Sequence, residues 1–235
     1  MVYRGTYSLR SAIDDLKTLK TRYKSYPDCR CEVHKGFYLA EQSVISSVTA
    51  EVTRLKSTTD LQNYAVKTTG HSLGAALAQL TAMDLLKSGF PTTVYNFGQP
   101  RVGDKDYAKF STDKLETFRV VHNKDIVPHL PFTTKMDFYH SCTEVFEDSK
   151  HNLRTCSSSS RDGGICEDSS CADQYKLAQT RVSEHLFYLG MRVNCQAVSG
   201  IRADAPDGDS EDDEPLKEAD EADRAADEAE HAGEK

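Results

Sequence analysis

The stretch Tyr64-Ala-Val-Lys-Thr-Thr-Gly-His-Ser-Leu-Gly-Ala-Ala76 decides how this chain folds. Residues 64–69 are typical of a buried β-strand, and the small residues 74–76 begin a helical pattern. The turn between them is Gly70-His-Ser-Leu-Gly74. A strand, a sharp turn and a helix in this order would lift the hydroxyl of Ser72 above the edge of a sheet, because glycines let neighbouring backbones come close.

A Gly-x-Ser-x-Gly match is modest evidence when it stands alone, because a chain of this length contains one by chance about one time in ten. Here the match has the strand and helix that a nucleophilic serine requires on either side. The setting resembles the nucleophile turn of α/β-hydrolases. We therefore interpret Ser72 as a catalytic nucleophile rather than as part of a glycine-rich turn without chemistry.

Strand and helix patterns alternate along the rest of the chain. We expect a strand ending at Val2-Tyr3, a helix over 8–19 and helical spacing over 36–55. Further strands are expected over 93–97, 117–121 and 138–146, and helices from about 104 and over 179–189. This alternation is typical of a mostly parallel sheet covered by helices. The sequence predicts one α/β domain over residues 1–200, with no internal repeat.

The charge of the chain is concentrated at its end. The 235 residues carry a net charge of −8, but residues 204–235 alone contain fifteen acidic and three basic residues. Leu216 is the one large apolar residue in that segment, so little surface is available for burial. We expect residues 201–235 to be a disordered acidic tail, more simply read as a solvated segment than as a tether for calcium or a basic partner.

The seven cysteines favour disulfides over a metal site, because none of them has zinc-finger spacing with partnering histidines. Disulfides indicate an oxidising compartment and hence secretion. The start of the chain has neither the charged and apolar pattern of a signal peptide nor a membrane helix. We therefore expect a secreted protein whose signal peptide is missing from this sequence.

A serine nucleophile needs a histidine to take its proton and an acid to orient that histidine. In α/β-hydrolases the acid and then the histidine follow the serine along the chain. Asp125 comes just after the strand pattern 117–121 and is our candidate acid; Asp104 and Asp106 are rivals that we interpret as helix caps. Among the histidines, His185 is our candidate base.

His140 is the competing histidine. It lies inside an apolar strand pattern, where a structural histidine with satisfied hydrogen bonds is the more common finding.

Six ordered motifs resemble the class 3, fungal-type triacylglycerol lipase family, whose relatives include the type A feruloyl esterases. They are Tyr3-Arg-Gly-Thr6, Val33-His-Lys-Gly-Phe37, Thr69-Gly-His-Ser-Leu-Gly74, Gly98-Gln-Pro-Arg-Val-Gly-Asp104, Asn123-Lys-Asp-Ile-Val-Pro-His-Leu-Pro131 and His185-Leu-Phe-Tyr-Leu-Gly190. The resemblance covers residues 2 to about 195. It implies the α/β-hydrolase fold and a triad of Ser72, Asp125 and His185, in agreement with the assignment made from position.

The resemblance also assigns the oxyanion hole and a lid. It implies that Thr6 and the backbone N–H of Leu73 form the oxyanion hole, where each donor contributes on the order of 3 kcal/mol to transition-state stability. The lid would cover about residues 7–20, with an apolar face of Leu9, Ile13 and Leu16. A surface helix packed on the core would carry the same apolar stripe.

Family members begin well before the Arg-Gly-Thr strand, so the resemblance implies that the chain lacks the family's N-terminal elements. It also implies a small loop bridge between Cys29 and Cys31, and a cysteine, Cys195, left without its N-terminal partner. We expect Cys156 to pair with Cys166 or Cys171. The sequence suggests no partner for Cys142.

The sequence-based hypothesis is a serine hydrolase of carboxylic esters, most simply a triacylglycerol lipase acting through an acyl-enzyme. Feruloyl or other soluble esters are the alternative substrates, and a non-catalytic remnant is the alternative of another class. We expect no metal and no cofactor, an ester or lipid as the partner, possible contact with a lipid–water interface, no nucleic acid, no transmembrane segment and a monomer.

Overall fold

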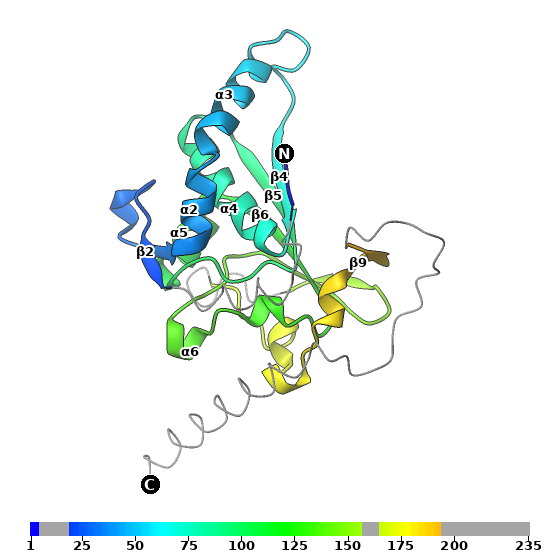
Figure 1. Cartoon of the computed structure of the whole chain (residues 1–235). Helices are drawn as coiled ribbons and strands as arrows, with labels where there is room; N and C mark the ends of the chain where they lie inside the picture. Colours follow the sequence, from blue (N-terminus) through cyan, green and yellow to red (C-terminus); the bar gives the residue numbers. More distant parts are fainter. Residues whose placement is uncertain (5–18, 157–164, 194–235) are drawn as a thin grey trace.

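A six-stranded sheet forms the centre of the computed structural model, which describes residues 1–4, 19–156 and 165–193 (Figure 1). In spatial order the strands are β1 (Val2–Tyr3), β4 (Val66–His71), β5 (Thr92–Phe97), β6 (Glu116–His122), β7 (Glu144–Glu147) and β8 (Leu153–Thr155). Each neighbouring pair from β1 to β7 is parallel, and β8 runs antiparallel to β7. The mostly parallel sheet expected from the sequence is confirmed.

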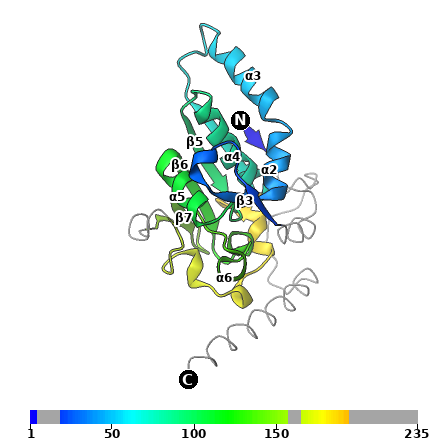
Figure 2. The same cartoon turned by 90° about the vertical axis from the view of Figure 1, so that its left-hand side faces the viewer.

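The α-helices connect these strands. They are α2 (Lys35–Gln42), α3 (Ile45–Lys56), α4 (Leu73–Lys87), α5 (Lys105–Lys114) and the short α6 (Thr133–Met136). In Figures 1 and 2, α2, α4 and α5 lie on the same side of the sheet. Among the described residues, no helix is both long and apolar enough to cross a membrane.

Short elements complete the described chain. There are 3-10 helices at Pro27–Cys29 (η1), Val127–His129 (η2), Ala172–Gln174 (η4), Leu177–Gln179 (η5) and Ser183–Leu186 (η6). Two small antiparallel pairs are β2 (Lys20–Arg22) with β3 (Glu32–His34), and β9 (Phe187–Tyr188) with β10 (Met191–Arg192).

Helix α4 is the centre of the core because it is buried on nearly every side. Ala75, Ala78, Leu80 and Met83 are fully buried in it. Small side chains at its start let the helix pack closely against β4 and β5. The helix that follows Ser72 is therefore held rigidly against the sheet.

Three sequence predictions were wrong in their boundaries or type. The helical spacing over 36–55 forms two helices, because the chain turns at Ser43–Val44. The strand expected over 138–146 is regular at 144–147, with isolated bridges before it. The expected helix over 179–189 does not form; the segment contains the end of η5, then η6 and β9.

Tertiary contacts hold this last segment in its irregular path. The hydroxyl of Tyr188 donates to Asp125, and the N–H of Leu189 donates to Glu147 over 3.0 Å. The left-handed backbone at Leu189 and Gly190 turns the chain into β10. Contacts with strand ends far away in the sequence thus override the local helical spacing.

Two disulfides attach the chain around residues 165–171 to the sheet. Cys142 pairs with Cys166, and Cys156 pairs with Cys171, which selects one of the two partners expected for Cys156. The Cys29–Cys31 bridge is confirmed. Cys195 lies outside the described residues.

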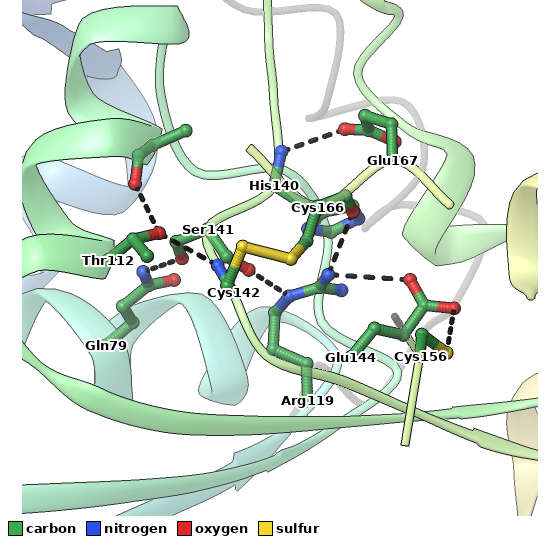
Figure 3. The surroundings of a disulfide bond; sticks show 11 residues. Gln79, Thr112, Arg119, His140, Ser141, Cys142, Glu144, Cys156, Cys166 and Glu167 are labelled. Atoms are coloured by element: carbon green, nitrogen blue, oxygen red, sulfur yellow. Dashed lines mark hydrogen bonds and ion pairs between the residues drawn. A yellow bond between two sulfur atoms is a disulfide. The ribbon is translucent and has the colours of Figure 1, made fainter. Parts of the chain in front are cut away.

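A buried arginine lies beside the first of these disulfides and binds the chain on both sides of it (Figure 3). Arg119 is fully buried and donates from Nε to the carbonyl of Ser141 over 2.7 Å. Its Nη2 contacts both Glu144 at 3.5 Å and the carbonyl of Cys166 at 3.3 Å. A charge buried in this way must be paired, so Arg119 fixes the β6–β7 edge to the Cys166 loop.

A second buried ion pair anchors the same loop. Arg101 binds both oxygens of Glu167, at 2.9 and 2.8 Å, and Glu167 also accepts from the backbone N–H of His140 (Figure 3). Burial acts to raise the pKa of Glu167, but Arg101 outweighs it and lowers the pKa to about 2. The segment that leads to residue 185 is therefore fastened by two disulfides and two buried ion pairs.

Two carboxyl groups meet where α2 packs against α4. Glu41 is fully buried, and Asp84 is nearly so. Burial, followed by the charge of Asp84, raises the pKa of Glu41 to about 7. Gln42 and Ser25 donate to Asp84 over 2.9 and 3.0 Å, which favours Asp84 as the ionised member of the pair.

Glu41 makes the stability of the fold depend on pH. A carboxyl group whose pKa is raised by folding stabilises the fold while it is protonated, so this stability is lost as the pH rises from about 4.5 to about 7. In Glu41→Gln we expect the loss of unfolding free energy between pH 5 and pH 8 to be smaller by on the order of 2 kcal/mol. Urea denaturation at the two pH values measures it.

The exposed Glu51 of α3 offers a matched control, and Glu51→Gln should keep the pH dependence of the unmodified chain. An unchanged pH dependence in Glu41→Gln would contradict the assignment.

Candidate active site

Ser72 occupies the turn between β4 and α4. Its backbone has φ 59° and ψ −131°, a conformation that few non-glycine residues adopt, and its N–H donates to the carbonyl of Phe97 over 3.0 Å. A β-carbon on Gly74 would lie 2.6 Å from the carbonyl oxygen of Tyr3. Glycine at this position therefore lets the end of β1 pass directly beside the start of α4.

Asp125 and His185 are brought together over 60 residues of sequence. Both side chains are fully buried, and Nδ1 of His185 donates to Oδ2 of Asp125 over 2.7 Å. The other oxygen of Asp125 accepts from the backbone N–H of Val127 over 2.9 Å. Burial acts to raise the pKa of Asp125, but the charge and hydrogen bond of His185 outweigh it and hold the pKa below its usual value.

Gly98 brings the imidazole of His185 next to the serine turn. A β-carbon on Gly98 would lie 2.7 Å from Cε1 of His185, and the backbone there is left-handed, with φ +54°. Gly98 follows Phe97, whose carbonyl accepts from Ser72. The second nitrogen of the ring, Nε2, is buried and makes no hydrogen bond with the described residues. A ring fixed through Nδ1 with Nε2 unpartnered can accept a proton.

His71 supports His185 from the side of the serine turn. The two rings lie 4.3 Å apart between centroids, and Nε2 of His71 donates to the backbone carbonyl of His185 over 2.8 Å. Burial, with a smaller effect from His185, lowers the pKa of His71 to about 4. His71 is therefore neutral near pH 7 and adds no competing positive charge beside His185.

The rival residues have structural positions. Asp104 caps α5, with its Oδ1 accepting from the N–H of Tyr107 over 2.8 Å, and Asp106 lies exposed in the first turn of that helix. Nε2 of His140 donates to the carbonyl of Pro128 over 2.7 Å. The interpretation of Asp104 as a cap is confirmed, whereas Asp106 does not cap the helix. His140 has a structural contact through Nε2, but its buried Nδ1 makes no hydrogen bond with the described residues.

Four of the candidate residues fall outside the described residues: Thr6, Leu9, Ile13 and Leu16. Leu73, the other candidate for the oxyanion hole, is the first residue of α4. Backbone N–H groups in the first turn of a helix have no partner within the helix, so the N–H of Leu73 can bind an anion.

Sequence reasoning missed Tyr188. Its hydroxyl donates to Oδ2 of Asp125, the oxygen that also binds His185, and its ring is fully buried. Nothing in the motif around Asp125 indicates that a tyrosine 63 residues further along the chain binds its carboxylate. The signal was its place in the motif that begins at His185, two residues after Leu186.

Two clusters in the described residues contain enough potential ligands for a metal ion. In one of them, two of the three members are the cysteines of the Cys156–Cys171 disulfide, which cannot bind a metal as thiolates. The other contains His122, Glu147 and His151. Its members are separated by 25 and 4 residues, a spacing that does not match the zinc-finger pattern considered for the cysteines.

The comparisons with known proteins agree with this geometry. Residues 1–135 match the family model described as Lipase (class 3). A lipase of Rhizomucor miehei is 34% identical over 201 residues, covering 82% of this chain and 52% of the relative. The secreted mono- and diacylglycerol lipase A of Penicillium cyclopium is 30% identical over 191 residues, covering 80% of this chain and 61% of the relative.

A solved triacylglycerol lipase, described as having a serine protease triad as its catalytic centre, superposes with a TM-score of 0.70. The two are 32% identical, and the match covers 80% of this chain and 70% of that one. The chain thus spans between half and two thirds of the length of the two curated relatives. With the family model matching more than half of its residues, and with an α/β-hydrolase sheet around the serine turn, this chain belongs to the class 3 lipase family.

Proposed function

We propose that this chain hydrolyses carboxylic esters, with acylglycerols as the substrate class, through a triad of Ser72, His185 and Asp125. The observation that carries the proposal is the buried 2.7 Å hydrogen bond from His185 to Asp125, which leaves Nε2 without a partner beside the serine turn. Histidine held by an acid in this way is the arrangement that activates a serine.

The chemistry follows from the positions of these groups. Nε2 of His185 takes the proton of the Ser72 hydroxyl as Oγ attacks the ester carbonyl, and Asp125 remains ionised and stabilises the imidazolium. The N–H of Leu73 stabilises the oxyanion, together with Thr6. His185 then gives its proton to the leaving alcohol, and water releases the acid from the acyl-enzyme by the same steps.

The substrate class rests on the relatives. Both curated relatives are named as lipases, one of them for mono- and diacylglycerols. Secretion is part of the proposal, supported by the three disulfides, which persist in oxidising compartments, and by the relative named as secreted. We propose that the protein acts as a monomer on ester or lipid substrates and that residues 201–235 take no part in catalysis.

Ser72→Ala should abolish ester hydrolysis. Without the hydroxyl no acyl-enzyme can form, so we expect kcat for tributyrin to fall by at least about 10⁴-fold with an unchanged circular dichroism spectrum. Ser88→Ala, at the opposite end of α4, is the matched control and should retain full activity. Activity that survives in Ser72→Ala would refute the mechanism.

Asp125→Asn should leave the fold in place and lower kcat by about 10³- to 10⁴-fold, because an amide cannot hold the same tautomer of His185 or stabilise its positive charge. KM should change little. Asp106→Asn tests the exposed rival acid and should behave as the unmodified chain. Equal losses in the two variants would argue against Asp125 as the acid.

The substrate class is tested by comparing tributyrin, a long-chain triglyceride emulsion and methyl ferulate. We expect a higher kcat/KM on both acylglycerols than on methyl ferulate. The reverse order would assign the site to soluble aromatic esters. A folded chain that hydrolyses none of the three would support the alternative of a non-catalytic remnant.

A further inference from the structure

We propose that His122, Glu147 and His151 form a binding site for a transition-metal ion, best suited to Zn²⁺, beside the candidate active site. One ligand atom from each residue lies within 4.8 Å of the others. His122 and Glu147 are buried, whereas the side chain of His151 is 46% exposed, so an ion can reach the cluster from solvent.

The sheet itself places the first two ligands side by side. His122 ends β6, Glu147 ends β7, and the two residues are directly paired in the parallel register. The N–H of Asn123 donates to the carbonyl of Glu147 over 2.7 Å, which continues the pairing one residue past β6. Both side chains therefore extend from rigid strand ends rather than from free loops.

A tight turn brings the third ligand back onto this edge. His151 lies between β7 and β8 in a left-handed conformation, with φ 63°, and its N–H donates to the carbonyl of Asp148 over 2.9 Å. The carboxylate of Asp148 accepts from the N–H groups of Lys150 and Asn152 and closes the turn. As a result the imidazole of His151 stacks on that of His122, with centroids 5.6 Å apart.

Each buried ligand is also held by a second contact, as is usual in metal sites. Nδ1 of His122 donates to the backbone carbonyl of Glu184 over 3.1 Å and lies 3.2 Å from the carboxylate of the same residue. These contacts orient the ring and occupy Nδ1, so a metal would bind through Nε2. Oε2 of Glu147 accepts from the N–H of Leu189 over 3.0 Å. Its Oε1 faces Nδ1 of His151 at 2.7 Å. A bound ion would replace the proton between these two atoms and release it to solvent.

The ligand types decide which ion fits. Two imidazoles and one carboxylate suit Zn²⁺, whereas Mg²⁺ and Ca²⁺ prefer ligand sets made of oxygen. Three protein ligands leave a fourth position for water on the exposed side of His151.

The ion would also brace the segment that carries His185. Glu184 precedes His185 directly, and Leu189 follows Tyr188, whose hydroxyl binds Asp125. Both residues are fastened to the cluster by the contacts described above. We therefore expect bound Zn²⁺ to stabilise the fold without entering the ester-hydrolysis steps.

The test is isothermal titration of the full chain, freed of metal with EDTA and dialysed, with ZnCl₂ at pH 7.5. We expect one saturable site with an affinity for Zn²⁺ that excess Mg²⁺ or Ca²⁺ does not change. His151→Ala should weaken this site by more than about 100-fold, since loss of a direct ligand should exceed the effect of losing an outer contact. Glu147→Gln should weaken it similarly.

His231→Ala is the control, because His231 lies among many carboxylates in the sequence of the acidic segment 204–235. It should bind Zn²⁺ as the unmodified chain does. Each variant is compared with its own melting temperature in EDTA, because His151→Ala also loses the contact with the buried Glu147. The rise in Tm on adding Zn²⁺ should occur in the unmodified chain and in His231→Ala but not in His151→Ala.

Cobalt gives an independent readout, because Co²⁺ bound at a four-coordinate site absorbs visible light, and this absorption should require His151. The proposal is overturned if no saturable site is found, if His151→Ala binds Zn²⁺ as tightly as the unmodified chain, or if His231→Ala loses the site.

Discussion

The turn at Ser72 is the constraint on which the rest of the structure depends. A serine held at φ 59° and ψ −131° is unfavourable in isolation and persists because the surroundings fix it from both ends. Strand β4 lies between β1 and β5 in a parallel register, and α4 is buried on nearly every side. The hydrogen bond from Ser72 to Phe97 joins the turn to the next strand. Rigid packing on each side thus holds a local conformation that the serine alone would not adopt.

The same edge of the sheet collects the other polar groups because parallel strands all end there. Phe97, His122 and Glu147 end β5, β6 and β7, and Asp125 follows β6 by three residues. His185 has no such strand of its own. It reaches this edge because the disulfides and buried ion pairs described above fasten the preceding loop to the sheet. The acid is thus placed by topology, whereas the base is placed by crosslinks.

The sequence was informative where local chemistry determines structure. A Gly-x-Ser-x-Gly turn between a strand and a helix pattern predicts its own geometry, and the Asp104 cap follows from its place at the start of a helix. The path of residues 179–189 could not be predicted, because its apolar spacing fits a helix and contacts with Asp125 and Glu147 override it. The partner of Cys142 was missed for the same reason. It depends on how Arg119 and the strand edge fold the Cys166 loop back.

The position of Glu147 explains why two kinds of site can share one edge without sharing their chemistry. Its carboxylate binds His151 and Leu189, on the far side of His122 from the serine turn, whereas Asp125 is saturated by His185, Tyr188 and Val127. Asp125 and its three partners are all buried, so this acid has no position that an ion could reach from solvent. A histidine and a glutamate at paired strand ends, with one exposed histidine above them, do have such a position. Asp125 and Glu147 both lie at or just after neighbouring strand ends, but only Glu147 has an exposed partner, His151. The proposed metal site and the proton transfer at His185 therefore use different carboxylates.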